Sequence, residues 1–310
     1  MRGLSPSILG SLMEENGILS PVLKKVQQDH SLMLAIRKGY INIYYRGGNI
    51  LKITEGGNDS FSTFFADDYS KDGIEPSKGL PSQIKTTQHS EEWVRALPYL
   101  KEVMDSFFSL VKNKPEREFQ QLVARENNYS TVSNETEYFI SDIEFNEKSI
   151  GARFDLMAIR WLANQRQNGA NCRAAFVEMK YGDDALKGDA GLVKHLKDME
   201  ELISSVNYEN ILKTMEAQFN QLDQLGLVTF NRSKKFDQIS IDRKQKPEVI
   251  FLLANHNPRS TTLRSILEHE EFNKHALSDC FDLRFFVSSF AGYAFHSNCM
   301  KTLSEFKELL

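Results

Sequence analysis

An acid and a base stand two residues apart near the end of a strand-like run, RAAFVEMKYG, at residues 173–182. Glu178 and Lys180 would share one face of that strand, because side chains alternate across a strand, and Met179 would point to the other face. Asp155 interrupts the neighbouring run, RFDLMAI, in the same way. A charge inside a buried strand is costly unless it is paired, hydrogen-bonded or metal-bound. The three charged residues therefore predict a shared site.

Two carboxylates on adjacent strands are a donor set for a hard cation. Mg²⁺ is usually held by one or two carboxylates together with waters and substrate phosphate oxygens. A bound Mg²⁺ lowers the pKa of a water and stabilises charge that develops at phosphorus. Lys180 would then hold the attacking water or neutralise the transition state. We therefore expect Asp155 and Glu178 to bind Mg²⁺ (or Mn²⁺) for metal-assisted phosphodiester hydrolysis.

The elements around these residues are those of an α/β domain. Pro115 suits the first position of a helix, and acids follow it in the first turn. Three strand-like runs come next, then two amphipathic helices, the second ended by Gly226, and then two more strands. This order predicts an α/β sandwich with a mixed sheet. The expected strands are TEYFISDIEF, ARFDLMAIRW, RAAFVEMKYG, PEVIFLLAN and DLRFFVSSFAGY.

The first hundred residues are expected to form a separate β-rich α+β unit. Two β-rich runs flank Arg46-Gly47-Gly48-Asn49, and Gly-Gly permits positive φ, so a hairpin is expected there. FSTFFADDY is expected to supply a third strand, and a helix over 91–112 leads into the second unit. We therefore expect an N-terminal domain over residues 1–105 and a second domain, which carries the charged site, over residues 106–310.

Two further positions are candidates for the same site. Glu116 precedes Phe119 by three residues and Val123 by seven, so it borders the apolar stripe of its helix. Glu118 is the alternative acid on this helix, and either acid could simply complement the helix dipole. Gln218 interrupts the apolar face of the second amphipathic helix, where it would either enter the site or bond to backbone.

This arrangement resembles the PD-(D/E)XK nuclease superfamily, which has the restriction-endonuclease-like fold. The likeness rests on Asp155, on Glu178-x-Lys180 in the next strand, and on the order of elements across residues 110–295. PEREFQQ is similar to a helix of archaeal Holliday-junction resolvases, and AQFNQL is similar to the helix after E-x-K in RecB-like nucleases. Phe154 stands where the family often has proline, and the interval between the two acids is longer than in compact members.

The resemblance implies an αβββαβ core with a mixed central sheet flanked by helices. It implies that Asp155, Glu178 and Glu116 bind one or two divalent cations, that Lys180 assists catalysis, and that Gln218 lies in the active site. The implied activity is Mg²⁺-dependent cleavage of DNA, and homodimers are common among similar nucleases. Two alternatives stay open: a non-catalytic nucleic-acid-binding or assembly module that retains the fold, and a structural protein in which Glu178 and Lys180 form an edge-strand salt bridge.

Basic residues could contact nucleic acid at two places. Residues 231–246 contain six Lys or Arg against two Asp, which could neutralise DNA phosphates, although a solvated loop is equally consistent with this composition. Arg153 and Arg160 flank the Asp155 strand and could contact phosphate or pair structurally. His195 lies on an apolar helix stripe and is expected to be a packing residue whose polar atoms are satisfied.

Composition limits the classes that remain. The chain has 310 residues and a formal net charge of −4, so any nucleic-acid surface must be a local patch. Its three cysteines form no C-x-x-C pair, which argues against a disulfide framework or a structural zinc site. The run VIFLLA is far too short to span a membrane, and the N-terminus lacks an apolar signal-peptide core. We therefore expect a cytoplasmic protein.

Overall fold

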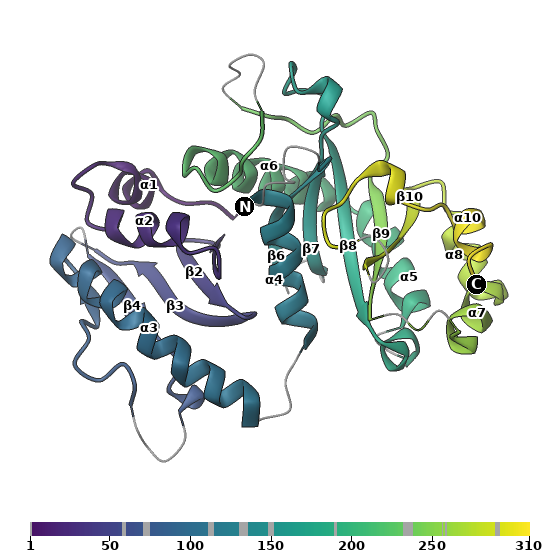
Figure 1. The fold of residues 1–310 in the computed structure, drawn as a ribbon. Helices are drawn as coiled ribbons and strands as arrows, with labels where there is room; N and C mark the ends of the chain where they lie inside the picture. Colours follow the sequence, from purple (N-terminus) through teal and green to yellow (C-terminus); the bar gives the residue numbers. More distant parts are fainter. Residues whose placement is uncertain are drawn as a thin grey trace. The chain divides into compact units, whose positions relative to one another are not determined.

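The computed structural model divides into two compact units (Figure 1). The N-terminal unit comprises residues 2–121 and 221–227, and the C-terminal unit comprises residues 122–220 and 228–310. Helix α4 (Pro115–Asn128) therefore contributes residues to both units. The residues that the structure describes are 2–57, 60–70, 75–110, 115–129, 136–147, 152–188, 191–231, 238–255, 257, 259–288 and 292–310.

The N-terminal unit contains an antiparallel sheet whose five strands are arranged in sequence order. Arg46 and Gly47 join the second strand to the third, and both have positive φ, 49° and 74°, as a two-residue hairpin turn requires. The expected hairpin is therefore confirmed, and the expected third run forms the fourth strand. The strands are β1 (Leu32–Ile36), β2 (Tyr40–Tyr45), β3 (Gly48–Glu55), β4 (Phe61–Phe64) and β5 (Gln83–Ile84).

Among the described residues, the helices that lie wholly within this unit are α1 (Pro6–Met13), α2 (Ser20–Gln28) and α3 (Thr87–Leu110). Helix α2 contacts β1, and α3 contacts β3. Buried side chains such as Leu97 of α3 and Ile53 of β3 form its apolar core. A short 3₁₀ turn, η1 (Asp67–Tyr69), follows β4.

The C-terminal unit contains a mixed sheet with the strand order β10-β9-β8-β7-β6. Strands β6, β7 and β8 form an antiparallel meander, whereas β9 is parallel to β8 and β10 is parallel to β9. The expected α/β class with a mixed sheet is therefore confirmed. The strands are β6 (Tyr138–Glu147), β7 (Ala152–Arg160), β8 (Arg173–Tyr181), β9 (Glu248–Ala254) and β10 (Asp282–Val287).

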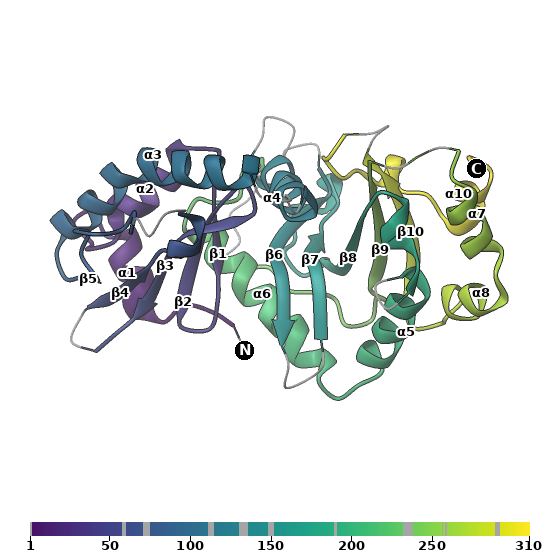
Figure 2. The same cartoon turned by 90° about the horizontal axis from the view of Figure 1, so that it is seen from below.

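The helices of this unit follow from its strand connections (Figure 2). Parallel strands need a crossover, and two helices that the sequence analysis did not anticipate, α7 and α8, form the crossover from β9 to β10. Gly226, with φ of 66°, follows the end of α6 as expected. The helices and 3₁₀ turns are η3 (Ala163–Gln165), η4 (Asp183–Leu186), α5 (Leu192–Ile203), α6 (Tyr208–Gln224), α7 (Thr261–Glu268), α8 (Glu270–Ala276), η6 (Ser297–Cys299) and α10 (Leu303–Lys307).

The two faces of the mixed sheet have different packing partners. Phe176 of β8 contacts Tyr208 of α6, and we call this side the α6 face. Glu178 lies two residues beyond Phe176 and therefore shares the α6 face. On the reverse face, Tyr138 of β6 packs edge-on against Phe295. Strands β8 and β9 are buried along almost their whole length, so any charge that they carry lies inside the unit.

Candidate functional site

Glu178 and Lys180 form a buried ion pair on the central strand of the mixed sheet. Lys180 Nζ donates to Glu178 Oε1 at 2.9 Å, and the two side chains are only 4% and 7% exposed. Both residues lie on β8, which is hydrogen-bonded to β7 on one side and to β9 on the other. The interpretation as an edge-strand salt bridge is therefore wrong, because the pair lies in the interior of the sheet.

Asp155 reaches the same segment of β8 from the neighbouring strand. Its Oδ2 accepts a hydrogen bond at 2.8 Å from the backbone N–H of Met179, the residue between Glu178 and Lys180. The paired register of β7 and β8 ends at Leu156↔Val177, so Asp155 lies just beyond the last paired residue. Its carboxylate thus bonds to backbone where the strand ladder stops.

The ladder between β6 and β7 continues past Asp155, with Ile143 opposite Leu156 and Phe145 opposite Phe154. Between these pairs, Glu144 has a positive φ of 50°, a backbone conformation that is uncommon outside glycine.

A histidine from α5 also reaches Glu178. His195 Nε2 lies 2.9 Å from Glu178 Oε1, the oxygen that Lys180 already contacts. The sequence predicts a satisfied packing histidine here, and this contact gives the His195 ring an acidic partner. Burial opposes ionisation of Glu178, but the contact with His195 and the charge of Lys180 outweigh burial and hold the pKa of that carboxyl below its usual range.

Gln218 bonds to a different carboxylate. Its Nε2 donates at 2.8 Å to Oδ2 of Asp142 on β6, and both side chains are almost completely buried. Oδ1 of Asp142 accepts from the backbone N–H of Ile143 at 2.9 Å. The sequence analysis did not single out Asp142, although it interrupts an apolar run just as Asp155 does. The structure thus places carboxylates inside three successive strands, β6, β7 and β8.

The two candidate acids on the helix before the sheet, Glu116 and Glu118, belong to the N-terminal unit. Glu118 forms a two-point ion pair with Arg46, at 2.9 and 3.2 Å, and Arg46 also contacts Asp105 at 2.9 Å. This pairing gives Glu118 a structural role within its own unit. Glu116 is half-buried in the first turn of α4, and its role at the site stays a prediction.

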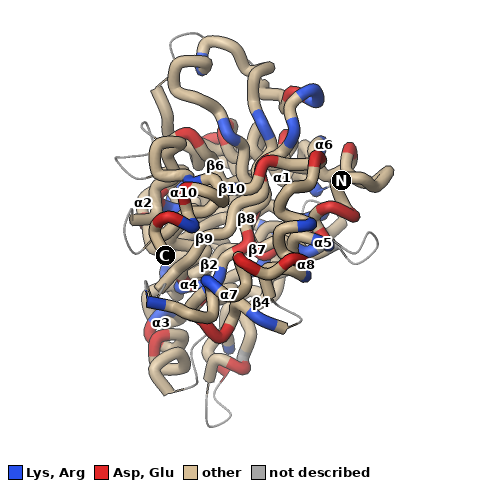
Figure 3. The backbone as a smooth tube through the Cα atoms, turned by 90° about the vertical axis from the view of Figure 1, so that its right-hand side faces the viewer, with Lys and Arg blue, Asp and Glu red and all other residues tan. Residues whose placement is uncertain are grey.

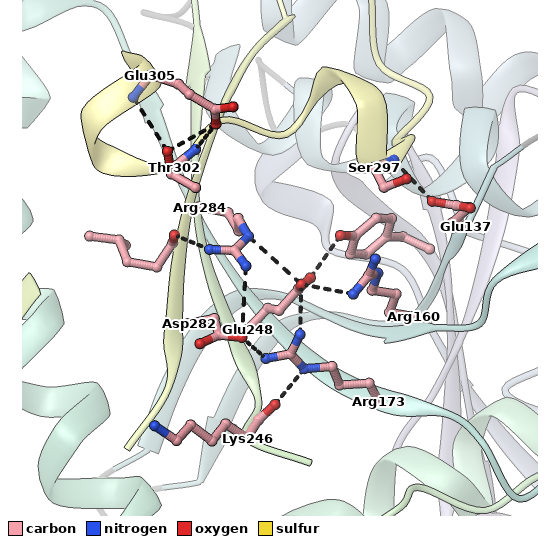
Figure 4. Close-up of polar contacts among 12 residues, drawn as sticks. Glu137, Arg160, Arg173, Lys246, Glu248, Asp282, Arg284, Ser297, Thr302 and Glu305 are labelled. Carbon is pink, nitrogen blue, oxygen red and sulfur yellow. Dashed lines mark hydrogen bonds and ion pairs between the residues drawn. The ribbon is translucent and has the colours of Figure 1, made fainter. Parts of the chain in front are cut away.

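A second charged cluster lies on the reverse face, at the start of β8, β9 and β10 (Figure 4). The buried carboxylate of Glu248 accepts from Arg160 at 3.1 Å, from Arg173 at 3.0 Å and from Tyr138 Oη at 2.7 Å. Arg173 also pairs with Asp282. Arg160 therefore pairs structurally, one of the two outcomes expected for it.

The basic segment at residues 231–246 lies only partly within the described residues, which leave out 232–237. Its Arg243 pairs with Glu209 at 3.0 Å and with Glu216. Lys and Arg positions are interspersed with Asp and Glu along the chain in Figure 3. These observations favour the solvated-loop interpretation for the described part of the segment.

The chemistry of the Asp155–Glu178 pair fits a hard divalent cation. Both side chains offer carboxylate oxygens, and one or two carboxylates are what Mg²⁺ takes from a protein when water and phosphate supply its remaining ligands. Within the described part of the chain, no three His, Cys, Asp or Glu side chains form a group that could hold a metal ion.

Comparison with protein families, curated proteins and solved structures finds no match for this chain. Among the helices that the structure describes, none is both long enough and apolar enough to cross a membrane.

Proposed function

We propose that the C-terminal unit is a divalent-cation-dependent nuclease that hydrolyses phosphodiester bonds in DNA. The observation that carries the proposal is the hydrogen bond between the Asp155 carboxylate and the backbone of Met179. Through this bond, an acid on one strand meets the buried Glu178–Lys180 pair on the next. Side chains of these three types around one sheet position are the set that the PD-(D/E)XK resemblance requires.

The strand connections support the same proposal. The antiparallel meander β6–β7–β8 is followed by helices α5 and α6 and then by β9, parallel to β8. With α4 before the meander, the elements follow the αβββαβ order of the restriction-endonuclease-like fold. Asp155 and Glu178 occupy the second and third strands of that order, where the resemblance assigns the metal-binding acids.

The energetic cost of the site is a further argument for function. A buried ion pair often stabilises a protein no better than apolar side chains of similar size would, because both charges lose their hydration. Strand β8 is otherwise apolar on the α6 face, so an apolar side chain at Glu178 or Lys180 would be compatible with a stable fold. Retention of charges in such a place is typical of a functional site.

Each residue has a defined role in the proposed reaction. Asp155 and Glu178 would hold the cation, which when bound lowers the pKa of a water and stabilises charge at phosphorus. Lys180 would position the attacking water or neutralise charge on the phosphate oxygens. Gln218 fixes the buried Asp142 carboxylate.

The proposal is tested by incubating labelled double-stranded and single-stranded DNA with the full-length protein and Mg²⁺ or Mn²⁺. We expect metal-dependent cleavage that falls by at least about 100-fold in Asp155→Asn and in Lys180→Met. Glu200→Gln is a matched control, because this acid lies on α5 of the same unit but pairs with His275 and Ser278. Cleavage that is unchanged in both site variants would contradict the proposal.

The non-catalytic alternative predicts a different pattern. A module that only binds nucleic acid would retain DNA in a salt-dependent manner, because phosphate contacts release counterions. It would show no cleavage with either metal ion. That combination would favour the binding or assembly module over the nuclease.

A further inference from the structure

A row of charged side chains crosses the reverse face of the mixed sheet, and the proposed reaction gives none of them a role (Figure 4). Arg160 of β7 lies directly opposite Arg173 of β8. Asp282 of β10 lies directly opposite Glu248 of β9, and Arg284, two residues beyond Asp282, shares its face. Like charges directly opposite each other destabilise a sheet, so the two facing arginines need an anion beside them.

The buried carboxylate of Glu248 is that anion, and both of its oxygens are engaged. Its Oε1 accepts from Arg160 at 3.1 Å and from Arg173 at 3.0 Å. Its Oε2 accepts from Tyr138 Oη at 2.7 Å, and the side chain is only 1% exposed. Arg173 also pairs with Asp282. Both carboxylates of the row are therefore bound to Arg173.

Two acids farther out have partners of their own. Asp279 lies 3.5 Å from the ammonium of Lys246. Glu305 accepts from the backbone N–H and the hydroxyl of Thr302, and these bonds cap a helix. The three guanidinium groups of the row thus share two carboxylates, and one positive charge is in excess.

The outer two arginines, Arg160 and Arg284, have hydrogen-bond donors to spare. Arg284 Nε is 3.9 Å from Glu248 and its Nη2 is 3.7 Å from Asp282, and both distances are too long for a hydrogen bond. Arg160 uses Nη1 for Glu248, while its Nη2 bonds to none of the described residues. Neither Nη2 is among the buried unpartnered atoms of the described residues, and the two side chains are 21% and 26% exposed. Solutes can therefore reach these donors.

The two guanidinium groups flank one point of the sheet. Arg160 Nη1 and Arg284 Nε lie 3.1 and 3.9 Å from the same oxygen, Glu248 Oε1. Phosphate presents several oxygens, so it can accept from two guanidinium groups at once, and arginine is well suited to such contacts. We propose that Arg160 and Arg284 bind a phosphate-type oxyanion on the reverse face. This site is independent of the proposed nuclease function, because Asp155 and Glu178 take no part in it.

Isothermal titration calorimetry of the full-length protein with inorganic phosphate at low ionic strength tests the site. We expect saturable binding whose dissociation constant rises at least about tenfold in Arg284→Gln, because hydrogen bonds to charged groups are strong. Arg243→Gln is the matched control, since this arginine is already paired with Glu209 and Glu216, and its affinity for phosphate should be unchanged. Asp155→Asn should also bind phosphate as the unsubstituted protein does.

A second arm distinguishes free phosphate from the phosphate of a nucleic-acid strand. Fluorescence anisotropy of labelled single-stranded DNA is measured in phosphate-free buffer at several salt concentrations. If the oxyanion belongs to a strand, Arg284→Gln should weaken binding and reduce the salt slope by about one. If it is free phosphate, Arg284→Gln should lower phosphate affinity and leave DNA binding unchanged.

The site is overturned if the unsubstituted protein binds neither phosphate nor DNA, or if Arg284→Gln changes neither affinity relative to Arg243→Gln. The first of these measurements needs no substitution, so it does not depend on how a variant folds. Either result would leave the nuclease proposal standing, because that proposal depends on cleavage by the Asp155 and Lys180 variants. Loss of the nuclease proposal would likewise leave the phosphate titration unaffected.

Discussion

Removal of the Lys180 ammonium should destabilise the protein through the acid that it leaves behind. The two charged atoms of Lys180 and Glu178 are 2.9 Å apart and almost completely buried. At an effective dielectric constant of about 20, their attraction is about 6 kcal/mol, much of which offsets the lost hydration of the two charges. Lys180→Met removes the attraction and leaves the carboxylate buried. We expect a loss of about 3 kcal/mol, the lower end for a broken buried pair, because His195 still contacts Glu178.

A double-mutant cycle measures this coupling. Urea unfolding at pH 7, followed by circular dichroism, gives the free energy of unfolding for Lys180→Met, Glu178→Gln and the double variant. The double variant should be more stable than Lys180→Met, because Gln leaves no uncompensated charge, and the coupling should be about 2 kcal/mol. Lys194→Met is the control: this lysine forms an exposed i,i+4 pair with Asp198, so its loss should cost about 0.5 kcal/mol or less.

The reasoning would be refuted by an additive cycle, or by a Lys180→Met variant no less stable than the Lys194→Met control. Either result would mean that the buried carboxylate does not depend on the neighbouring ammonium. Added Mn²⁺ provides an independent check in the same assay. Because a bound cation supplies positive charge beside Glu178, Mn²⁺ should stabilise Lys180→Met by at least as much as the unsubstituted protein.

The depressed pKa of Glu178 stabilises the folded state at pH values above about 4.3, the pKa of the unfolded carboxyl, and this stabilisation is lost as the pH falls through the lower pKa of the folded state. In urea unfolding from pH 6 to pH 3, the difference in free energy of unfolding between the unsubstituted protein and Glu178→Gln should therefore shrink only below about pH 4.3. Gly47→Ala should cost about 2 kcal/mol or more in the same assay, because φ is 74° and the added Cβ would lie 2.5 Å from the backbone of Arg117; equal stability would contradict this close approach. Glu248→Ala should cost about 3–5 kcal/mol by leaving buried guanidinium groups without their carboxylate, yet should not change the dissociation constant for Mn²⁺, since Glu248 lies on the reverse face.

Local sequence patterns were sufficient to predict much of the fold. The apolar strand runs marked each strand of the mixed sheet, and Gly47 marked the hairpin because a two-residue turn needs positive φ. Helices α7 and α8 were missed because each is short, and their start signals, Ser260 and His269, are side-chain caps that read as loop residues in the sequence. Helices α1 and α2 were missed for a similar reason: each spans about two turns, and its apolar stripe is brief.

Only those features of the site that follow from the alternation of side chains along a strand, or from a charge within an apolar run, could be predicted. Alternation placed Glu178 and Lys180 on one face, and the charge within an apolar run identified Asp155. The hydrogen bond from the Met179 amide to the Asp155 carboxylate joins two strands, and no pattern along a single strand predicts it. The approach of His195 depends on how α5 packs against the sheet, and this tertiary contact cannot be derived from spacing along the helix.

The central claim is that Asp155 and Glu178 hold a divalent cation. The most direct measurement is a crystal structure of the protein soaked in Mn²⁺, with anomalous diffraction data collected to locate the metal. The account predicts a manganese peak within bonding distance of both carboxylates, at the end of the β7–β8 ladder. Manganese found only elsewhere, with Asp155 still bonded to the Met179 amide and Glu178 contacted by Lys180 and His195 alone, would contradict it.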